Sequence, residues 1–561
     1  MQLQELVLPD YRGLRDFHLD LTDAVDDSGH AIAVLIGRNG SGKSRALHAL
    51  AEIFGGLYRR TMATDGRAPF AYNMRYLLRG TVVEVGQTSP SSSPVMMASS
   101  VGGTPVQVPI KEWGHHLPDH VFGYQVPSRT PWVSEFTKHR IFAQKAVTHW
   151  RRKWVAEWNQ WLDVRAPGEQ FSEELTLPIS CPLYTPGFLF TPSLLPLIIL
   201  SLASQWSESF GNYLRKEAHI EGVASATLRI RPSRASTRTA WAQFPFWGLG
   251  GPARTLFVAL ADSGRFGAIP EADPEVLLLG DLEESGHDAA GSPDDGFTIN
   301  MDTAADVLAF RNMFDSDLSM FGLLATLYDA GYLTAHVRLR NTAGTSLNTD
   351  DLSSGEQQML TVLGLLRLQR GQESLFLLDE PDAHFHPEWS QYWYSSVRSM
   401  LDDGQESQFV AATHDPILVA NIAREQIRVV HQTSTGTAVA LIPSTNPRGH
   451  GAGGLLTTEL FGLRSQLDLH TQSLIDRQYA LVPQAEFDEQ KAAELRSVTE
   501  ELDLLGFSTE RRDPDVSAFL AELRRRRRDL AEMAEVPGSL TAEELSSLVA
   551  QLFHERFSRG L

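Results

Sequence analysis

The alternation of apolar and polar residues predicts a strand-rich start to the chain. Residues 3–8 (LQELVL) and 15–21 (RDFHLDL) are typical of strands, and residues 31–36 (AIAVLI) form the continuous apolar run of a buried strand. A helix is predicted from about Lys43, after a glycine-rich turn. The first part of the chain is therefore expected to hold two strands, a buried strand, a turn and a helix.

The next segments are less regular. Residues 71–86 alternate as a hairpin with its turn at Arg79-Gly80, and the Ser-, Pro- and Gly-rich residues 88–107 predict a flexible loop. Residues 136–222 have a mainly helical pattern, and the acidic, Gly- and Pro-rich residues 263–300 predict a surface insertion. Four tryptophans recur at helical spacing and are expected in the core: Trp150, Trp154, Trp158 and Trp161.

Regular periodicity returns near residue 351. Residues 351–371 predict a helix with a serine cap, and residues 374–381 (SLFLLDEP) predict a strand that ends in acidic residues. Residues 408–416 (QFVAATHDP) predict a strand that ends in a histidine. Beyond about residue 484 the pattern indicates a helical accessory domain.

Composition narrows the class of protein. The 561 residues, 42% of them hydrophobic, suffice for two to four domains, and the single cysteine, Cys181, excludes a disulfide framework. The start of the chain lacks a signal pattern, and the apolar run Leu194–Ser204 is shorter than the roughly 20 residues that span a bilayer. We therefore expect a cytoplasmic protein with no membrane partner.

Charge limits how the chain could touch nucleic acid. A formal net charge of −20 argues against a surface that binds nucleic acid indiscriminately, but it does not exclude local basic grooves. The basic run Arg524–Arg528 has acidic neighbours, which favours a solvated helix face over a nucleic-acid or partner contact.

The strongest chemical signal follows the buried strand at 31–36. Residues 37–44 (GRNGSGKS) fit the pattern G-x-x-x-x-G-K-[ST] in its required context, a strand before and a helix after. The loop's backbone N–H groups and the helix N-terminus would hold phosphate oxygens, Lys43 would reach the β- and γ-phosphates, and Ser44 would offer a hydroxyl to Mg²⁺. The sequence therefore predicts an ATP site with Mg²⁺.

Two later strand ends supply further groups. Asp379 is expected beside the phosphate loop for Mg²⁺, and Glu380 can polarise a water molecule as a general base. His414 follows Glu380 by 34 residues (414 − 380) and is placed to contact the γ-phosphate or to orient the water. Residues 352–358 (LSSGEQQ) form a second anion-binding nest at a helix start, which a single nucleotide does not need.

The order of these motifs resembles that of the ABC-type ATPases: Walker A, an LSGGQ-like signature, Walker B and a switch histidine. The resemblance implies a head-to-tail homodimer, or a higher oligomer built on it, in which Ser353 and Gly355 of one subunit close on the ATP of the other. It also implies the roles of individual residues. The expected nucleotide-binding residues are Arg38, Asn39, Gly40, Ser41, Gly42, Lys43, Ser44, Arg45, Gln125, Ser353, Ser354, Gly355 and Glu356; Ser44, Asp379 and Gln125 are expected at Mg²⁺; Glu380 and His414 are expected to be catalytic.

The layout resembles one branch of that family. The gap of 309 residues between Ser44 and Ser353 (353 − 44) is far longer than in transport cassettes. The ending DEPDAHFHP resembles the RecF/SMC/OLD branch, with Asp382 and Phe385 where that branch has Glu and Leu. His384 and His386 are thus open to two interpretations, as dimer contacts or as plain turn residues.

Two further assignments follow from the resemblance. Gln125, after the strand HVFGY, is the expected Q-loop glutamine, with Gln87 as its rival. A Toprim nuclease, which many OLD proteins carry, is not expected, because no suitable acidic pattern follows His414.

The predicted fold is α/β: an ABC-ATPase head with a mixed sheet, flanking helices and an antiparallel β-subdomain, together with a large, mainly helical insertion and a helical C-terminal domain. The expected domains are residues 1–135 (first part of the head), 136–345 (insertion), 346–445 (second part of the head) and 446–561 (accessory domain).

The resemblance extends to stand-alone ATPases of bacterial restriction and anti-phage systems, such as the Septu ATPase. It implies an ATP-driven switch for a separately encoded effector, such as an HNH-type nuclease, that acts on nucleic acid. Two alternatives stay open: a RecF-like repair ATPase that itself binds DNA, and a non-hydrolysing, nucleotide-dependent scaffold.

Overall fold

The computed structural model describes the chain in two compact units, residues 1–462 and 463–561. The described residues are all except 63, 126–130, 166–175, 208, 233–244, 268–295, 401–406, 434–436, 464, 483–487 and 506–561. Among these described residues no helix is long and apolar enough to cross a membrane.

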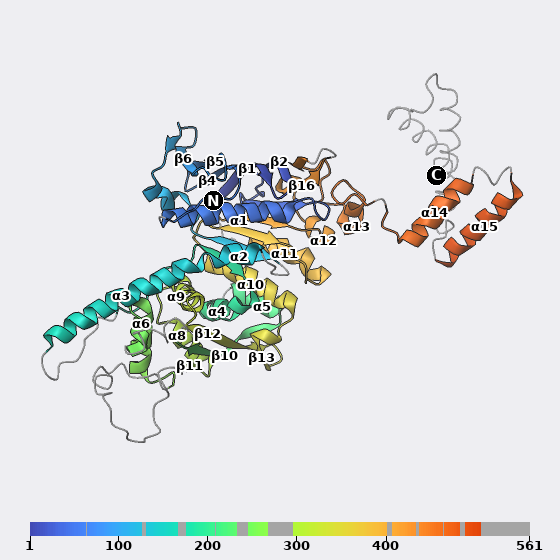
Figure 1. The fold of residues 1–561 in the computed structure, drawn as a ribbon. Helices are drawn as coiled ribbons and strands as arrows, with labels where there is room; N and C mark the ends of the chain where they lie inside the picture. The colour runs from blue at the N-terminus through green and yellow to red at the C-terminus, as the bar shows by residue number, and fades with distance from the viewer. Residues whose placement is uncertain are drawn as a thin grey trace. The chain divides into compact units, whose positions relative to one another are not determined.

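A 13-stranded mixed sheet forms the centre of the larger unit (Figure 1). Its spatial order is β7 (Val106–Gln107), β6 (Val95–Ser100), β5 (Thr81–Gln87), β4 (Tyr72–Leu78), β1 (Gln2–Tyr11), β2 (Leu14–Asp20), β17 (Thr437–Leu441), β16 (Ile427–Gln432), β3 (Ile32–Ile36), β15 (Gln408–Ala412), β14 (Leu375–Asp379), β8 (Val121–Gln125) and β9 (Gly187–Phe190). The strands from β16 to β9 are parallel, whereas those from β7 to β2 are antiparallel. The predicted α/β head with an antiparallel β-subdomain is confirmed.

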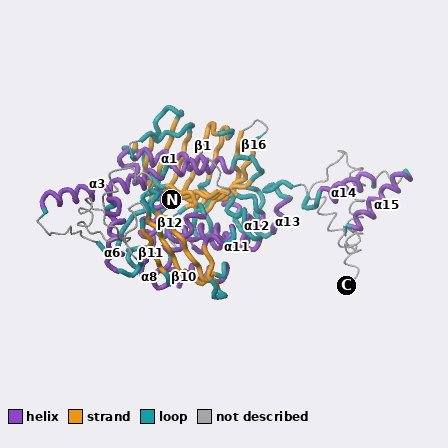
Figure 2. The backbone as a smooth tube through the Cα atoms, turned by 60° about the horizontal axis from the view of Figure 1, so that its bottom comes forward, coloured by secondary structure: helices purple, strands orange, loops and turns teal. Residues whose placement is uncertain are grey.

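Both faces of the parallel strands are buried, as their continuous apolar sequences predict. In β3 the side chains of Ile32, Val34 and Ile36 enter one hydrophobic core, while Ala33 and Leu35 enter the other. One core packs against α1 (Lys43–Thr61). The other packs against α10 (Ser354–Leu368), α11 (Pro387–Met400) and α12 (Pro416–Val419), so that the sheet lies between layers of helices (Figure 2).

The segment predicted as an insertion contains both helices and strands. Its helices among the described residues are α3 (Arg140–Val164), α4 (Leu195–Ser201), α5 (Ser209–Glu217), α6 (Gly251–Ser263), α8 (Ala304–Arg311) and α9 (Asp317–Asp329), and α2 (Pro131–Thr137) crosses its predicted start at residue 136. It also adds β9 to the edge of the main sheet and supplies three strands of a second sheet, in the order β11 (Phe297–Met301), β10 (Ile220–Ile230) and β12 (Leu333–Asn341), to which β13 (Ser346–Asn348), just past the predicted end at residue 345, adds a fourth. The predicted surface insertion at residues 263–300 lies mostly outside the described residues.

Several finer predictions can be compared with the structure. Trp150, Trp154 and Trp158 are buried as predicted, whereas Trp161 is only partly buried. All seven residues of α4 are buried, so this apolar helix belongs to the core. The prediction of a flexible loop at residues 88–107 is wrong, because β6 and β7 lie there. Its proline and serine content hid the alternation that places Met96 opposite Val85 and buries both side chains.

The smaller unit contains α14 (Leu469–Leu481) and α15 (Glu489–Leu504). The two helices pack through Leu474, Leu481, Val498 and Leu502, and the carboxylate of Glu494 accepts the Arg477 guanidinium at 2.7 Å. The short helix α13 (Gly451–Leu456) lies in the larger unit, although it follows the predicted domain boundary at residue 446. The basic run Arg524–Arg528 lies outside the described residues.

Candidate functional site

The glycine-rich loop connects β3 to α1 and is tightly packed. A Cβ atom at Gly37 would lie 2.2 Å from the carbonyl oxygen of Val430, and one at Gly42 would lie 2.3 Å from Cδ2 of Leu14. Both glycines also have positive φ angles, 146° and 114°. Because only glycine combines this backbone conformation with such close contacts, the loop can turn directly into the N-terminus of α1.

Lys43 begins α1, and its side chain is turned back across the loop. Its Nζ donates to the carbonyl oxygen of Gly37 at 2.7 Å and to that of Arg38 at 3.4 Å. Burial lowers the pKa of Lys43, while the nearby carboxylates of Glu380 and Asp379 act in the opposite direction. A buried ammonium group held by backbone carbonyls is suited to exchange those contacts for phosphate oxygens.

Asp379 is the point where three elements meet. It ends β14, and its two carboxylate oxygens accept hydrogen bonds from Oγ of Ser44 at 2.8 Å and from Nε2 of Gln125 at 3.0 Å. The parallel pairing of β14 with β8 places Asp379 directly opposite Gln125. Burial raises the pKa of Asp379, and the two hydrogen bonds oppose that shift. The structure thus gathers hydroxyl, carboxylate and amide oxygens, the hard ligands that Mg²⁺ prefers.

The rival glutamine has a different environment. Gln87 is buried in the β-subdomain, and its amide nitrogen donates to the carbonyl oxygens of Ala68, Phe70 and Ser89 at 2.7, 3.2 and 3.0 Å. Its hydrogen bonds are used to hold the local chain together. The geometry therefore favours Gln125 as the glutamine beside Asp379.

Glu380 and His414 lie side by side at the ends of adjacent parallel strands. Oε1 of Glu380 is 3.3 Å from Nδ1 of His414, and the two side chains are 36% and 56% exposed. Glu380 has a φ of 53°, an uncommon backbone conformation for a residue with a side chain, and its N–H donates to the carbonyl oxygen of Ala412 at 2.8 Å. The strand ends thus hold an accessible carboxylate beside an imidazole that can orient it.

A buried hydrogen bond connects these two strand ends. Oγ1 of Thr413 donates to the carboxylate of Asp382 at 2.8 Å and accepts from the N–H of Asp415 at 2.9 Å. Burial raises the pKa of Asp382 to about 6. Sequence patterns did not indicate a role for Thr413, because a threonine after a strand has many ordinary roles.

The signature residues form a self-contained helix cap. Ser353 is the N-cap of α10. Its Oγ accepts from the N–H of Glu356, and Oε2 of Glu356 accepts from the N–H of Ser353 at 2.8 Å. Ser353 and Ser354 are both exposed. Among the described residues, no hydrogen bond or ion pair joins residues 353–356 to the phosphate loop.

The glycine of the signature is needed for packing. A Cβ atom at Gly355 would lie 2.6 Å from the carbonyl oxygen of His384, and the Gln358 side chain donates to the carbonyl oxygen of Pro381. The start of α10 is thereby fixed to the turn after Glu380. The side chains of His384 and His386 are exposed on this turn, which leaves both interpretations of these histidines open.

The remaining predicted residues lie around the phosphate loop. Arg45 donates to the carbonyl oxygens of Arg12 and Gly40, both at 2.6 Å, and so fastens the loop to the turn between β1 and β2. The side chains of Arg38 and Asn39 are exposed, and Oγ of Ser41 is buried without a hydrogen-bond partner. This buried hydroxyl is suited to donate to a phosphate oxygen.

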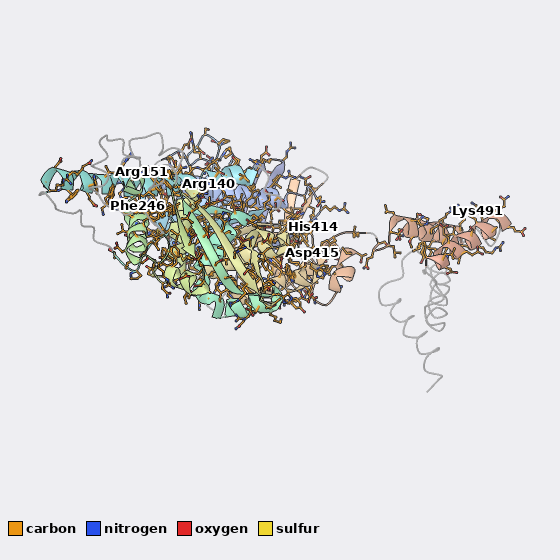
Figure 3. All side chains as sticks on the ribbon, turned by 90° about the horizontal axis from the view of Figure 1, so that it is seen from below. Arg140, Arg151, Phe246, His414, Asp415 and Lys491 are labelled. Carbon is orange, nitrogen blue, oxygen red and sulfur yellow. The ribbon has the colours of Figure 1, made fainter. Side chains whose placement is uncertain are left out.

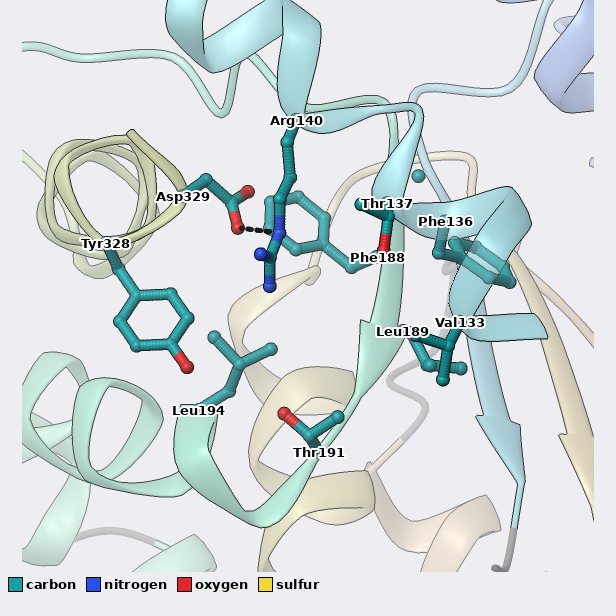
Figure 4. Close-up of a pocket in the computed structure, with 11 residues that line it drawn as sticks. Val133, Phe136, Thr137, Arg140, Phe188, Leu189, Thr191, Leu194, Tyr328 and Asp329 are labelled. Carbon is teal, nitrogen blue, oxygen red and sulfur yellow. Dashed lines mark ion pairs between the residues drawn. The ribbon is translucent and has the colours of Figure 1, made fainter. Parts of the chain in front are cut away.

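Another cavity lies away from these strand ends. It has a volume of about 90 Å³ and is lined by residues of α2, β9 and α9, by Arg140 at the start of α3, and by Thr191 and Leu194 between β9 and α4 (Figure 4). Nε of Arg140 lies 3.3 Å from a carboxylate oxygen of Asp329 at its edge, and burial raises the pKa of Asp329 to about 6. None of the predicted nucleotide, metal or catalytic residues lines it.

Comparisons with known proteins support the interpretation of the motifs over part of the chain. Residues 256–420 match a family model described as "AAA domain, putative AbiEii toxin, Type IV TA system". This range contains the signature, Asp379, Glu380 and His414, whereas the glycine-rich loop precedes it.

Two curated relatives match a similar share of the chain. The Septu protein PtuA of Bacillus mycoides (strain KBAB4) is 26% identical over 161 residues, which cover 27% of this chain and 22% of that protein. The Retron Vc95 probable ATPase of Vibrio cholerae serotype O1 biovar El Tor is 26% identical over 168 residues, which cover 27% of this chain and 31% of that protein. The chain thus matches less than a third of each relative's length.

Solved structures that match this chain include SMC head domains. One from Pyrococcus furiosus has a TM-score of 0.32 at 10% identity and is covered to 96%, with 78% of this chain; one from Thermotoga maritima has a TM-score of 0.31 at 10% identity and is covered to 100%, with 79% of this chain. These scores are low. The family match and the two relatives confirm that the chain resembles the ABC-type ATPases of the RecF/SMC/OLD branch, including the ATPases of bacterial defence systems.

Proposed function

We propose that this chain is an ATP-hydrolysing switch of the cytosol that closes as a head-to-tail homodimer. The observation that supports it most is the convergence on Asp379 of Ser44 from the phosphate loop and Gln125 from β8. Such an arrangement gives a nucleotide-bound Mg²⁺ a set of oxygen ligands next to the phosphates. Mg²⁺ there would neutralise the charge of the β- and γ-phosphates.

In this proposal each residue has a defined task. The N–H groups of the loop and the ammonium of Lys43 bind the phosphates, and Lys43 gives up its contacts with the Gly37 and Arg38 carbonyls to do so. Glu380 accepts a proton from the attacking water. His414, 3.3 Å from that carboxylate, holds it in position and contacts the γ-phosphate.

The state of the signature supports the proposed dimerisation. Ser353 and Glu356 satisfy each other, and Ser353 and Ser354 face solvent. An exposed, capped helix start can receive the phosphates of a nucleotide that is held by a second copy. ATP would then lie between two chains, and hydrolysis would release them.

The likeness to the Septu protein and to a retron ATPase supports a role in anti-phage or restriction-type defence. We assign the dimer the task of holding or releasing a separately encoded effector, such as an HNH-type nuclease. A RecF-like repair ATPase is the second candidate, and the exposed Arg229 of β10 and Arg338 of β12 favour direct contact with nucleic acid.

A test of the switch is the variant Glu380→Gln, which keeps the shape of the side chain and removes the base. With ATP and Mg²⁺, size-exclusion chromatography should show a stable dimer that the wild type forms only transiently, together with loss of phosphate release. A variant that hydrolyses ATP at the wild-type rate would contradict the role of Glu380. A hydrolysing protein that stays monomeric throughout would contradict dimer closure.

A further inference from the structure

The second sheet of the larger unit has one face packed on helices and one face turned to solvent. Leu228 and Ile230 of β10 and Val337 and Leu339 of β12 are buried in the core that contains α4, α8 and α9. The neighbouring residues along each strand point the opposite way, since side chains alternate across a sheet. The strands β10 and β12 cross the front of the molecule in Figure 3.

The outward residues form a regular polar grid. The pairing of β10 with β12 places Thr227 opposite His336, Arg229 opposite Thr334 and Ser225 opposite Arg338. The flanking strands add Thr298 and Asn300 from β11 and Asn348 and Ser346 from β13, which pair with Arg229, Thr227, Arg338 and Arg340. Paired residues of an antiparallel sheet lie on the same face, so these side chains share one surface, which we call the basic sheet face.

The charge of this face is opposite to that of the chain. The whole chain has 69 acidic and 49 basic residues, yet the four strands contain three arginines and a histidine against one acid, Glu221. Glu221 is paired with Arg340 at 3.0 Å. Among the described residues, Arg229 and Arg338 have no carboxylate partner, and Nε of Arg338 donates only to the Asn348 side chain at 3.4 Å. An acid-poor surface on a strongly acidic protein indicates an anionic ligand.

The types of side chain narrow the ligand further. Arginine, threonine, serine and asparagine are the side chains that contact phosphate and sugar oxygens in nucleic-acid complexes. The guanidinium fork matches a phosphate group with two parallel hydrogen bonds. The outward positions contain no Phe, Tyr or Trp on which an unstacked base could rest. The face therefore suits a regular phosphate backbone better than exposed bases.

We propose that the basic sheet face binds the phosphodiester backbone of double-stranded nucleic acid without reading its sequence. Arg229 and Arg338 each contact a phosphate group, and the hydroxyl and amide side chains between them contact neighbouring oxygens. Outward side chains of one strand recur about every 6.8 Å, so adjacent positions on β12 reach successive points along a backbone.

The position of the face connects this contact with the signature. Asn348 ends β13, caps the following turn at Thr349–Asp351 together with Asp351, and precedes Ser353 by five residues (353 − 348). Gln357 of α10 donates to the carbonyl oxygens of Thr349 and Leu352 at 3.2 and 3.1 Å. Arg338 and Asn348 would therefore hold a nucleic-acid backbone close to the start of α10, since only a short, hydrogen-bonded segment separates Asn348 from Ser353. Under the proposed function, this helix start contacts the ATP of a second copy.

The test is binding of a labelled duplex to the full chain in the absence of nucleotide, measured by fluorescence anisotropy over a series of salt concentrations. The double variant Arg229→Gln/Arg338→Gln should bind more weakly, and the slope of log K against log salt should become shallower by about 1.8, or about 0.9 for each phosphate contact removed. Binding of DNA and RNA duplexes of equal length is compared to determine which of the two nucleic acids the face prefers.

A matched control removes two positive charges elsewhere. Lys145 and Arg152 are exposed on α3, and Lys145→Gln/Arg152→Gln should leave the slope unchanged. An equal loss in both double variants would overturn the proposal, as would a wild-type chain that binds neither duplex. If the first double variant binds duplexes normally and loses only a protein partner, the face is a protein-docking surface and the proposal is wrong. Because no nucleotide is present, these outcomes are independent of whether the chain hydrolyses ATP.

Discussion

The two motifs that we propose to bind phosphate have different surroundings. Around the phosphate loop, side chains from separate elements converge: Ser44 and Gln125 both bond to Asp379, and Glu380 lies beside His414. Around the signature, the side chains of Ser353 and Glu356 bond to each other and to each other's backbone N–H, at the exposed start of α10. The first motif is assembled by one chain, whereas the second is complete only as a helix cap. This difference is what a site shared between two copies requires.

The largest expected effect is at Glu380, which lies beside the phosphate loop, the motif that one chain assembles by itself. Glu380→Gln should lower ATP turnover by roughly 10²- to 10⁴-fold, the usual contribution of a general base. Binding of a fluorescent ATP analogue should be unchanged, since the phosphate contacts remain. Glu388→Gln, an exposed acid on α11, is the control and should keep wild-type turnover. Loss of analogue binding in the Glu380 variant would mean that the residue holds the nucleotide and is not the base.

A smaller effect is expected at the signature, and a matched pair of helix caps isolates it. Ser353→Ala and Ser316→Ala each remove an N-cap serine, from α10 and α9, at a similar cost of about 1 kcal/mol in unfolding free energy. Only Ser353→Ala should also lower ATP turnover, by roughly ten-fold, because it removes a hydrogen bond to a charged phosphate. Equal turnover in the two variants would reduce the signature to a structural cap.

Gln125 and Gln87 test which glutamine belongs to the site around the phosphate loop. Gln125→Ala should raise the Mg²⁺ concentration needed for half-maximal turnover several-fold, because it removes a ligand and the donor to Asp379. Gln87→Ala should cost about 1–3 kcal/mol of unfolding free energy, because buried carbonyls lose their donor, and should leave the Mg²⁺ dependence unchanged. A Mg²⁺ titration and a urea titration on both variants check this. The reverse pattern would make Gln87 the functional residue.

The smallest effect concerns the link between the strand ends. Burial raises the pKa of Asp382 to about 6, above the value of about 3.9 in an unfolded chain. The ionised carboxylate therefore weakens the fold above that pH, and this penalty disappears as the pH falls below about 4. Asp382→Asn should be more stable than the wild type near neutral pH, by about 1–3 kcal/mol. Thermal unfolding from about pH 7.5 down to about pH 4.5 should show the advantage shrinking.

The exposed Asp10 on β1 provides a control substitution. Asp10→Asn also replaces a carboxylate by an amide, and near neutral pH it should leave the Tm close to that of the wild type, because the position is at the surface. An Asp382 variant that is less stable than the wild type at every pH would show that the hydrogen bond from Thr413 outweighs the desolvation of the carboxylate.

The sequence predicted the elements that surround the phosphate loop and left others unseen, for physical reasons. β3, β14 and β15 are buried on both faces, so their apolar runs are continuous and unambiguous. The sheet of the insertion is different, because each of its strands is buried on one side only and His336, Arg338 and Arg340 interrupt the apolar residues of β12. Local patterns therefore underestimated its strands.

Contacts between residues far apart in the chain also limited what the sequence could predict. The approach of Gln125 to Asp379 depends on the register of two strands that are 254 residues apart, and spacing along the chain does not give that register. The motif pattern named both residues through a family resemblance. It did not indicate that Thr413 and Asp382 connect the strand ends, because neither belongs to the motifs as catalytic groups.

The most direct test of a shared site is a mixing experiment. Lys43→Ala should bind no ATP but keep its signature, and Ser353→Arg should bind ATP but block its own signature, so that each variant alone is inactive. A one-to-one mixture forms dimers in which one of the two sites combines an intact loop with an intact signature. The account predicts that ATP turnover recovers to roughly a quarter of the wild-type rate, because half of the dimers are mixed and each has one working site. A mixture that stays as inactive as its components would contradict the shared site.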